Sequence, residues 1–333
     1  MKEKRRELIT TISEQLKQSK RVLVISHQRP DGDAIGSLLA MGLALIDAGK
    51  DVQMVLIDGI PDNFRFLSGT ELVKTIPTGI VDYIIVVDSA EVKRTNTDFN
   101  GYNPPNLNID HHKTNTLFAK INLVESDAVA TAEILARYLP EFGFRITKPI
   151  ANALLAGIVT DTIGFRTTNV NPNTFRMVAD LMEQGGELTD IYHRTIVEQS
   201  LASARYWGAG LSKIQMQDGL VWTTLSLKER YAAGYPARDD ADLVKILSAI
   251  EGTKVAVILT EQDAGYVKIS WRLCGSTDTD FDVSEIAQRF GGGGHKAAAG
   301  ADVKGDLSEV LIKVLTDTKL SMERVKDNIK AIR

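Results

Sequence analysis

Residues 22–33 read Val-Leu-Val-Ile-Ser-His-Gln-Arg-Pro-Asp-Gly-Asp, and this stretch decides the fold class. The run Val22–Ser26 is nearly all apolar, which is typical of a strand buried on both faces. Such strands belong to parallel sheets that are covered on both sides. The chain then turns abruptly polar from His27 to Asp33, which predicts that the strand ends at a functional site.

The flanking segments extend this pattern. Apolar residues spaced four apart predict a helix over residues 3–19, and Ala34–Ala48 predicts a second helix that ends at Gly49. Further strands are expected at 51–58, 82–88 and 107–110, and a helix at 150–159. Strands that alternate with helices predict an α/β fold with a parallel sheet and helices on both faces.

The second half predicts a smaller α/β domain. Gly185–Gln217 looks like a helical connector, since Gly185-Gly186 breaks the chain and a polar helix follows. Strands are then expected at 220–226, 254–261 and 266–273, and helices at 241–251, 282–290 and 306–318. We therefore expect a domain at 1–190, a connector at 191–217 and a second domain at 218–333, with an active-site cleft between the two domains.

Composition narrows the classes of function. The 333 residues carry a net charge of −4, which argues against the broad basic surface that grips long nucleic acid. That negative charge lies entirely in residues 1–190. No apolar run approaches the roughly 20 residues that span a bilayer, so no membrane association is expected. The single cysteine fits a reducing cytoplasm.

Aspartate and histidine recur where the predicted strands and one apolar helix end. They stand in Ser26–Asp33, at Asp88-Ser89, in Asp110-His111-His112 and at Asp161. Because the carboxyl ends of parallel strands meet at one edge, we expect these side chains to converge. So many carboxylates repel one another, and bound divalent cations would resolve that conflict. Mixed carboxylate and imidazole ligands suit Mn²⁺, with Mg²⁺, Co²⁺ or Zn²⁺ as alternatives.

Each motif also has a purely structural interpretation. A turn followed by a helix N-cap would explain Asp31 and Asp33, and a solvated strand end would explain Asp88. One dinuclear metal site explains all the motifs together, with two ions about 3.5–4 Å apart, suited to displacement at phosphorus.

A glycine-rich segment, Gly291–Gly300, stands in the second half. It lacks the spacing of a P-loop. Its glycines would let backbone N–H groups approach a phosphate, and His295 can donate a hydrogen bond; a flexible turn is the alternative. Arg272, near the end of a predicted strand, is the best further phosphate contact, because guanidinium binds phosphate bidentately.

These motifs, in this order, resemble the DHH phosphoesterase superfamily. The matching residues are His27-x-x-x-Asp31-Gly-Asp33, Asp88-Ser89, Asp110-His111-His112 and Gly157-x-x-x-Asp161-Thr162. Gly291–Gly300 resembles the signature of the associated C-terminal domain. The combination is most similar to the nanoRNase/pAp-phosphatase branch, relatives of the exonuclease RecJ.

The resemblance implies roles for individual residues. One metal would be held by His27 and Asp31, a second by Asp33, His111 and Asp161, and Asp88 would bridge both. Asp110 would orient its neighbours, and His112 would face the substrate phosphate. In the second domain, the substrate nucleotide would be bound by Arg272, Gly292, Gly293, Gly294 and His295.

The resemblance also implies an activity. A water activated by two metals would hydrolyse short oligoribonucleotides to mononucleotides and remove phosphate from pAp. The alternatives are a phosphodiesterase acting on cyclic dinucleotides or pApA, and a nucleotide-binding regulator that has lost catalysis. A homodimer is also consistent with the resemblance.

Overall fold

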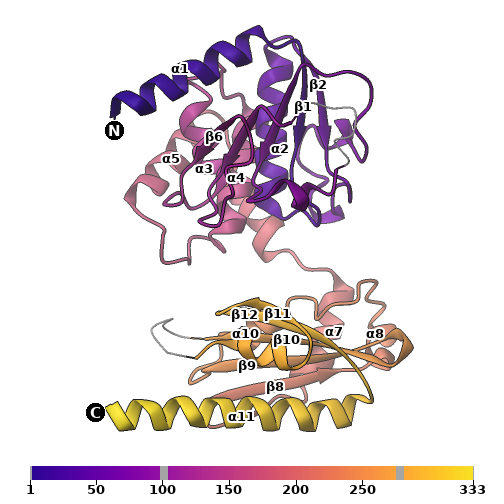
Figure 1. Cartoon of the computed structure of the whole chain (residues 1–333). Coiled ribbons are helices and arrows are strands. Elements are labelled where there is room, and N and C mark those ends of the chain that lie inside the picture. Colours follow the sequence, from indigo (N-terminus) through magenta and orange to yellow (C-terminus); the bar gives the residue numbers. More distant parts are fainter. Residues whose placement is uncertain (1, 98–103, 275–280, 333) are drawn as a thin grey trace. The chain divides into compact units, whose positions relative to one another are not determined.

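The computed structural model describes residues 2–97, 104–274 and 281–332, and its chain forms two compact units. The first unit extends to Glu198, and the second begins at Gln199. Each is built around its own six-stranded sheet (Figure 1). The domain boundaries and the interdomain cleft expected from the sequence remain predictions.

The first unit is the expected parallel α/β domain. Its strands are β1 (Arg21–Ile25), β2 (Asp51–Val55), β3 (Val73–Lys74), β4 (Tyr83–Val87), β5 (Leu107–Asp110) and β6 (Ile121–Val124). Its α-helices are α1 (Lys2–Gln18), α2 (Gly32–Asp47), α3 (Thr131–Tyr138), α4 (Lys148–Asp161), α5 (Pro172–Glu183) and α6 (Leu188–Tyr192). The strand order is β3-β2-β1-β4-β5-β6, and every neighbouring pair is parallel. The order reverses direction between β1 and β4, and ligands bind at such a switch point in open parallel sheets.

The helices of this unit pack their apolar residues against one face of the sheet. Val22 and Val24 of β1 join one core cluster with residues of α1 to α6. Leu23 and Ile25 point to the other face, where their buried cluster contains strand residues only. β1 is therefore buried on both faces, as its unbroken apolar run predicted.

The second unit contains a mixed sheet with helices on both faces. Its strands are β7 (Gln215–Gln217), β8 (Leu220–Leu225), β9 (Val255–Gln262), β10 (Tyr266–Leu273), β11 (Gly293–His295) and β12 (Ala298–Lys304). The order is β11-β12-β10-β9-β8-β7, and only β8 and β9 are parallel. One face packs on α10 (Val283–Arg289) and α11 (Leu307–Ile332), and the other on α7 (Leu201–Leu211), α8 (Leu227–Ala233) and α9 (Leu243–Ser248).

The glycine-rich segment differs from the loop that the sequence predicted. Gly293–His295 and Ala298–Lys304 form an antiparallel hairpin, β11 and β12, at the edge of the second sheet. Glycine and alanine have low strand propensity, so backbone pairing with β10 sets this conformation. Within the described part of the chain, no helix combines the length and apolar character that crossing a bilayer requires.

Candidate metal centre

The predicted site residues of the first unit lie at the carboxyl edge of its parallel sheet. His27 follows β1, Asp88 follows β4, and His111 follows β5 directly, while Asp161 is the last residue of α4. Strands β1 and β4 are neighbours at the switch point, so two of these positions flank the place where the topology opens a crevice. The topology thus brings distant motifs to one edge.

The ligand atoms of these side chains form overlapping groups, and we call the residues of these groups the aspartate–histidine cluster. The ligand atoms of His27, Asp31 and Asp88 lie within 4.8 Å of one another, as do those of Asp33, His111 and Asp161, and those of Asp88, His111 and His112.

Asp88 connects the first two groups. Its Oδ2 lies 3.5 Å from His27 Nε2, and its Oδ1 lies 3.7 Å from His111 Nε2. The two oxygens of one carboxylate therefore face different groups. Asp88 also has a left-handed backbone conformation, with φ of 53°, which Asp tolerates better than most residues.

Asp31 combines the two interpretations that its sequence allowed. Its Oδ1 accepts a hydrogen bond from Ala34 N at 3.0 Å, so it is the N-cap of α2. The same oxygen lies 3.8 Å from His27 Nε2, and the side chain is 62% exposed. The residue both begins the helix and faces the cluster.

Asp33 is held rigidly by the start of α3. Its Oδ2 accepts a hydrogen bond from Thr131 N at 2.6 Å, and its Oδ1 accepts one from Ala132 N at 2.9 Å. Thr131 Oγ1 also donates to Asp88 Oδ1 at 3.0 Å. A helix N-terminus stabilises negative charge, so this contact fixes two carboxylates at once.

Close packing of α4 makes room for Asp33. A Cβ added to Gly157 would lie 2.8 Å from Asp33 Oδ1 and 2.6 Å from Ala132 Cβ. A side chain there would push Asp33 away from the cluster. This steric requirement explains why the first position of the Gly157-x-x-x-Asp161 motif is glycine.

The cluster carries more negative charge than its surroundings neutralise. Burial, and then the charges of Asp88 and Asp161, raise the pKa of Asp33 well above its usual value. Burial, with the charge of Asp88 among the further causes, raises the pKa of Asp161 to about 6. The positive charge of a cation in the cluster would offset both shifts, because it stabilises the ionised form of a nearby carboxylate.

Asp88 is the carboxylate at which the neighbouring histidines outweigh burial, whereas at Asp161 they only reduce the rise in pKa. Burial raises the pKa of Asp88, but a hydrogen bond with His27 and the nearby His111 and His112 outweigh it and lower the pKa overall. Burial lowers the pKa of His27, but the hydrogen bond and charge of Asp88, together with a hydrogen bond to the backbone of Gln28 and the charge of Asp31, raise it overall. Asp88 and His27 thus stabilise each other's charged forms.

The donor set fits divalent cations. Metal–oxygen and metal–nitrogen bonds of about 2.0–2.2 Å place neighbouring ligand atoms roughly 3.0–3.6 Å apart. The ligand-atom pairs from His27 to Asp88 and from His111 to Asp161 are 3.5 and 3.6 Å apart. Carboxylate and imidazole are ligands that Mn²⁺ and similar ions accept.

His112 is committed to a different partner. Its Nδ1 lies 2.7 Å from Asp110 Oδ1, and this hydrogen bond is the main reason why the pKa of His112 is raised. Asp110 is fully buried, and its Oδ2 accepts a hydrogen bond from Asn115 Nδ2 at 2.5 Å. This carboxylate therefore orients the imidazole and leaves Nε2 of His112 as the nitrogen available to other groups.

Sequence reasoning missed Thr131 and Asn115. Each holds an aspartate of the site: Thr131 bonds Asp33 across 98 residues, and Asn115 bonds Asp110 five residues before it. The small residues Ala128–Thr131 at a helix start were the available signal for the first. The proximity of Asn115 to the paired histidines was the signal for the second.

The residues predicted to bind the nucleotide lie in the second unit. Arg272 and Gly293 line a cavity of about 280 Å³, whereas Gly292, Gly294 and His295 are not part of its lining. Gly292 could not carry a side chain, because a Cβ there would lie 2.1 Å from Gly300 O. His295 is an exposed residue at the end of β11.

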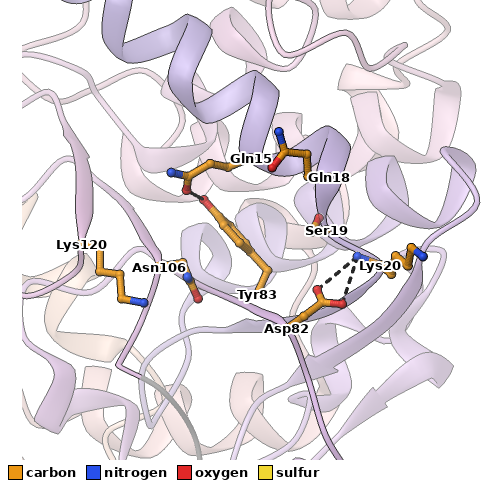
Figure 2. A pocket seen from close by; sticks show the side chains of 8 residues that line it. All are labelled: Gln15, Gln18, Ser19, Lys20, Asp82, Tyr83, Asn106 and Lys120. Carbon is orange, nitrogen blue, oxygen red and sulfur yellow. Dashed lines mark hydrogen bonds between the residues drawn. The ribbon is translucent and has the colours of Figure 1, made fainter.

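A larger pocket, of about 580 Å³, lies elsewhere in the first unit (Figure 2). Its lining residues Lys20, Asp82, Asn106 and Lys120 each precede a strand of the parallel sheet. They therefore mark the amino edge, opposite the aspartate–histidine cluster. Figure 2 shows the Tyr83 hydroxyl donating to Gln15 and the backbone N–H of Lys20 donating to Asp82. None of the candidate metal ligands lines this pocket.

A parallel α/β domain with a carboxylate–imidazole cluster at its switch point defines a class of proteins that bind divalent metals. Comparison with known proteins identifies the family. Residues 21–158 match the N-terminal domain of the DHH family, and residues 229–319 match the DHHA1 domain. The chain is 33% identical over 309 residues to the bifunctional oligoribonuclease and PAP phosphatase NrnA of Thermus thermophilus, covering 91% of this chain and 90% of the relative. The chain belongs to the DHH family and carries the DHHA1 domain, as its motifs predicted.

Solved structures agree on the fold. An exopolyphosphatase-related protein from Bacteroides fragilis has a TM-score of 0.86 and 25% identity, and the match covers 97% of this chain and 98% of that chain. RecJ of Thermus thermophilus in complex with Mn²⁺ has a TM-score of 0.51 and 14% identity, covering 96% of this chain and 54% of RecJ. The latter likeness concerns the fold alone.

Proposed function

We propose that this chain is a metal-dependent phosphoesterase that hydrolyses short oligoribonucleotides to mononucleotides and dephosphorylates pAp. The observation that carries the proposal is the complete aspartate–histidine cluster at the switch point. Identity to the Thermus oligoribonuclease and PAP phosphatase extends across both matched domains and supports the substrate class.

The cluster has donors for two cations. His27 and Asp31 would hold one, Asp33, His111 and Asp161 the other, and Asp88 would be shared because each of its oxygens faces a different group. Two such ions, when bound, would supply Lewis-acid activation of water and stabilisation of charge during in-line displacement at phosphorus. Mn²⁺ is our preferred ion, with Mg²⁺ and Co²⁺ as alternatives.

His112 is proposed to serve the leaving group. Its Nδ1 is bound to Asp110, and its raised pKa keeps the imidazole protonated to higher pH than usual. Its Nε2 can then donate a hydrogen bond to phosphate or a proton to the departing oxygen. Asp110 acts as a positioning residue, because its two hydrogen bonds fix the ring and the tautomer.

The second unit is proposed to bind the nucleotide. Arg272 is exposed and lines the cavity. Its guanidinium can therefore bind a phosphate bidentately. Gly292, Gly293, Gly294 and His295 would supply backbone and imidazole donors from the adjacent hairpin. A homodimer and a cytoplasmic location complete the proposal.

A direct assay tests this function. The purified chain is incubated with Mn²⁺ and end-labelled ribonucleotides of two to five residues, with pAp, and with pApA. We expect mononucleotides from the short oligomers and phosphate release from pAp. Turnover of pApA, without turnover of the oligoribonucleotides or of pAp, would favour the dinucleotide phosphodiesterase. Failure to turn over any substrate, with any of Mn²⁺, Mg²⁺ or Co²⁺, would leave the nucleotide-binding regulator instead.

A further inference from the structure

The second unit contains a buried carboxylate that the proposed chemistry does not use. Asp240 lies in the turn before α9 and is only 8% exposed. Its Oδ1 accepts a hydrogen bond from Asp242 N at 3.1 Å. Its Oδ2 is buried and has no hydrogen-bond partner within the described residues. A buried polar atom without a partner is costly and rare in folded proteins, so it requires an explanation.

Asp240 forms part of the wall of the cavity that Arg272 lines. Ser270 and Arg272 of β10 pair with Ile258 and Ala256 of β9, whose side chains pack in the core cluster with α9. Cross-strand partners point to the same face, so Arg272 projects on the side where Asp240 lies. The floor of the cavity is therefore part of the sheet face that α9 adjoins.

Beyond Arg272 the floor is formed by residues with almost no side chain. Ala298 and Gly300 of β12 pair with Arg272 and Ser270, and Gly293 of β11 pairs with Gly300. A floor of this kind lets a flat group approach the backbone closely. At about 280 Å³ the cavity is at the small end of ligand sites, which suits part of a nucleotide and not a long oligomer.

The charges on the two sides of this cavity are complementary to a nucleotide. Arg272 offers an exposed cation, and among the described residues Asp242 of the same cavity is already paired with Lys245 at 2.9 Å. Asp240 offers an acceptor without a donor. Its pKa is raised to about 6 by burial, and then by the charges of Asp242 and Asp239. A nucleotide supplies both missing partners, an anionic phosphate and neutral N–H or O–H donors.

We propose that Asp240 is a specificity-determining residue that accepts a hydrogen bond from an N–H or O–H donor of the nucleotide whose phosphate Arg272 binds. This inference rests on the proposed function. The torsion about the Cβ–Cγ bond of aspartate is broad, so the carboxylate can turn to present an oxygen to the cavity. The donor is either the ribose 2′-hydroxyl or an exocyclic amino group of the base, and both place the same demand on the carboxylate.

The test uses the intact chain and Asp240→Asn. The variant keeps the amide oxygen that accepts from Asp242 N, but it places an NH₂ donor where a carboxylate oxygen stood. Asp239→Asn is the matched control, because Asp239 is the adjacent residue, bonds Tyr235 and Ala241, and does not line the cavity. Calorimetry measures the affinities for AMP, for dAMP, which lacks the 2′-hydroxyl, and for IMP, which lacks the amino group.

We expect the wild type to bind AMP at least about tenfold more tightly than one of the two analogues, the ratio typical of a lost hydrogen bond to a charged group. Asp240→Asn should weaken AMP binding by about tenfold or more and bind AMP and that analogue equally, while Asp239→Asn behaves as the wild type. Weaker binding of dAMP to the wild type identifies the ribose as the source of the hydrogen-bond donor, and weaker binding of IMP identifies the base. With pApA as substrate, KM should rise while kcat changes less than about threefold.

Three results would overturn the inference. They are wild-type affinity in Asp240→Asn, an equal loss of affinity for all three nucleotides, and failure of the wild type to bind any of them. Because these are binding measurements, they are independent of turnover. An inert wild type that still discriminates between nucleotides would refute the proposed function and leave the role of Asp240 standing.

Discussion

The two candidate sites of this chain are built on sheets of different construction. The cluster of the first unit lies at the carboxyl edge of a parallel sheet, where Asp33 and Asp88 are buried and Thr131 bonds both. The cavity of the second unit lies on a mostly antiparallel sheet, and its floor is glycine and alanine beside an exposed Arg272. The first arrangement suits ligands of a resident ion. The second suits a ligand that enters and leaves.

This contrast predicts that changes in the cluster abolish turnover and that changes in the cavity weaken affinity. The largest effect is expected for Asp88→Asn. The variant retains an acceptor for Thr131 but loses the charge that connects both ligand groups. We expect kcat to fall by at least about 10³-fold, since removal of a charge at the centre of a two-metal site disables both functions of the metals. Steady-state kinetics with a labelled diribonucleotide measures it.

The control for this change is Asp127→Asn, which alters an exposed acid just before α3. It should retain turnover within about twofold, as surface substitutions usually do. Turnover of Asp88→Asn within tenfold of the wild type would show that Asp88 is not shared between two ions.

His112→Gln should have the next largest effect. It removes the proposed proton donor but none of the residues assigned to the metals, so kcat should fall by about 10²–10³-fold while the metal content stays unchanged. Rapid-quench kinetics combined with elemental analysis separates the two quantities. The control, His193→Gln, changes an exposed histidine after α6 and should leave both unchanged. Loss of metal in His112→Gln would make His112 a ligand instead.

Arg272→Ala tests the other side of the comparison. We expect KM for the diribonucleotide to rise by about tenfold or more, with kcat changed by less than about threefold, because the change removes a charge-assisted contact to substrate. Lys304→Ala, an exposed cation on β12, is the control and should change neither constant. A fall in kcat with unchanged KM would place Arg272 in the chemical step and would contradict the assignment of chemistry to the first site and binding to the second.

The smallest effect concerns pH and the metal-free protein. The pKa of Asp161 is raised to about 6 in the folded chain, against an ordinary value of 3.8, because the residue is buried. Its contribution to stability is therefore fully present below pH about 4 and is lost as the pH rises through about 6. Asp161→Asn has no carboxyl to ionise at this position, so it avoids this loss of folding stability. The variant should gain in melting temperature relative to the wild type between pH 4 and 7 in the presence of a chelator.

Saturating Mn²⁺ should reverse that comparison, because the ion binds more tightly to the protein that retains this ligand and therefore stabilises it more. A melting-temperature difference between Asp161→Asn and the wild type that is the same at pH 4 and pH 7, without metal, would contradict the assigned burial effect.

Local sequence patterns predicted the helices and strands that are marked by an apolar run or by an end signal in their own sequence. Leu107–Asp110 is a strand with the expected bounds, and the helix expected over 150–159 is α4. Gly49 follows α2 with φ of 77°, as a helix-ending glycine does. These elements have apolar runs or end signals within a few residues, so single-sequence reasoning suffices for them.

Elements whose conformation depends on distant partners were missed. The strand Ile121–Val124 is short and only partly buried, and it is defined by pairing with β5. The hairpin of β11 and β12 is rich in glycine and alanine, which indicate a loop when read locally. α11 continues to Ile332, beyond the predicted end at 318.

The same distinction applies to the site. The aspartates and histidines were visible in the sequence because each follows a strong apolar segment, and the fold does bring them together. Thr131 was not visible, because its contact with Asp33 spans 98 residues. Asp240 was not visible either, since only the structure shows that one of its oxygens lacks a partner.

The central claim is that the cluster of the first unit binds two divalent ions through a shared Asp88. Calorimetric titration of the metal-free chain with Mn²⁺ tests it most directly. We expect two ions bound per chain in the wild type and fewer than two in Asp88→Asn. A wild type that binds no Mn²⁺, or an Asp88→Asn variant that binds two ions with unchanged affinity, would contradict it.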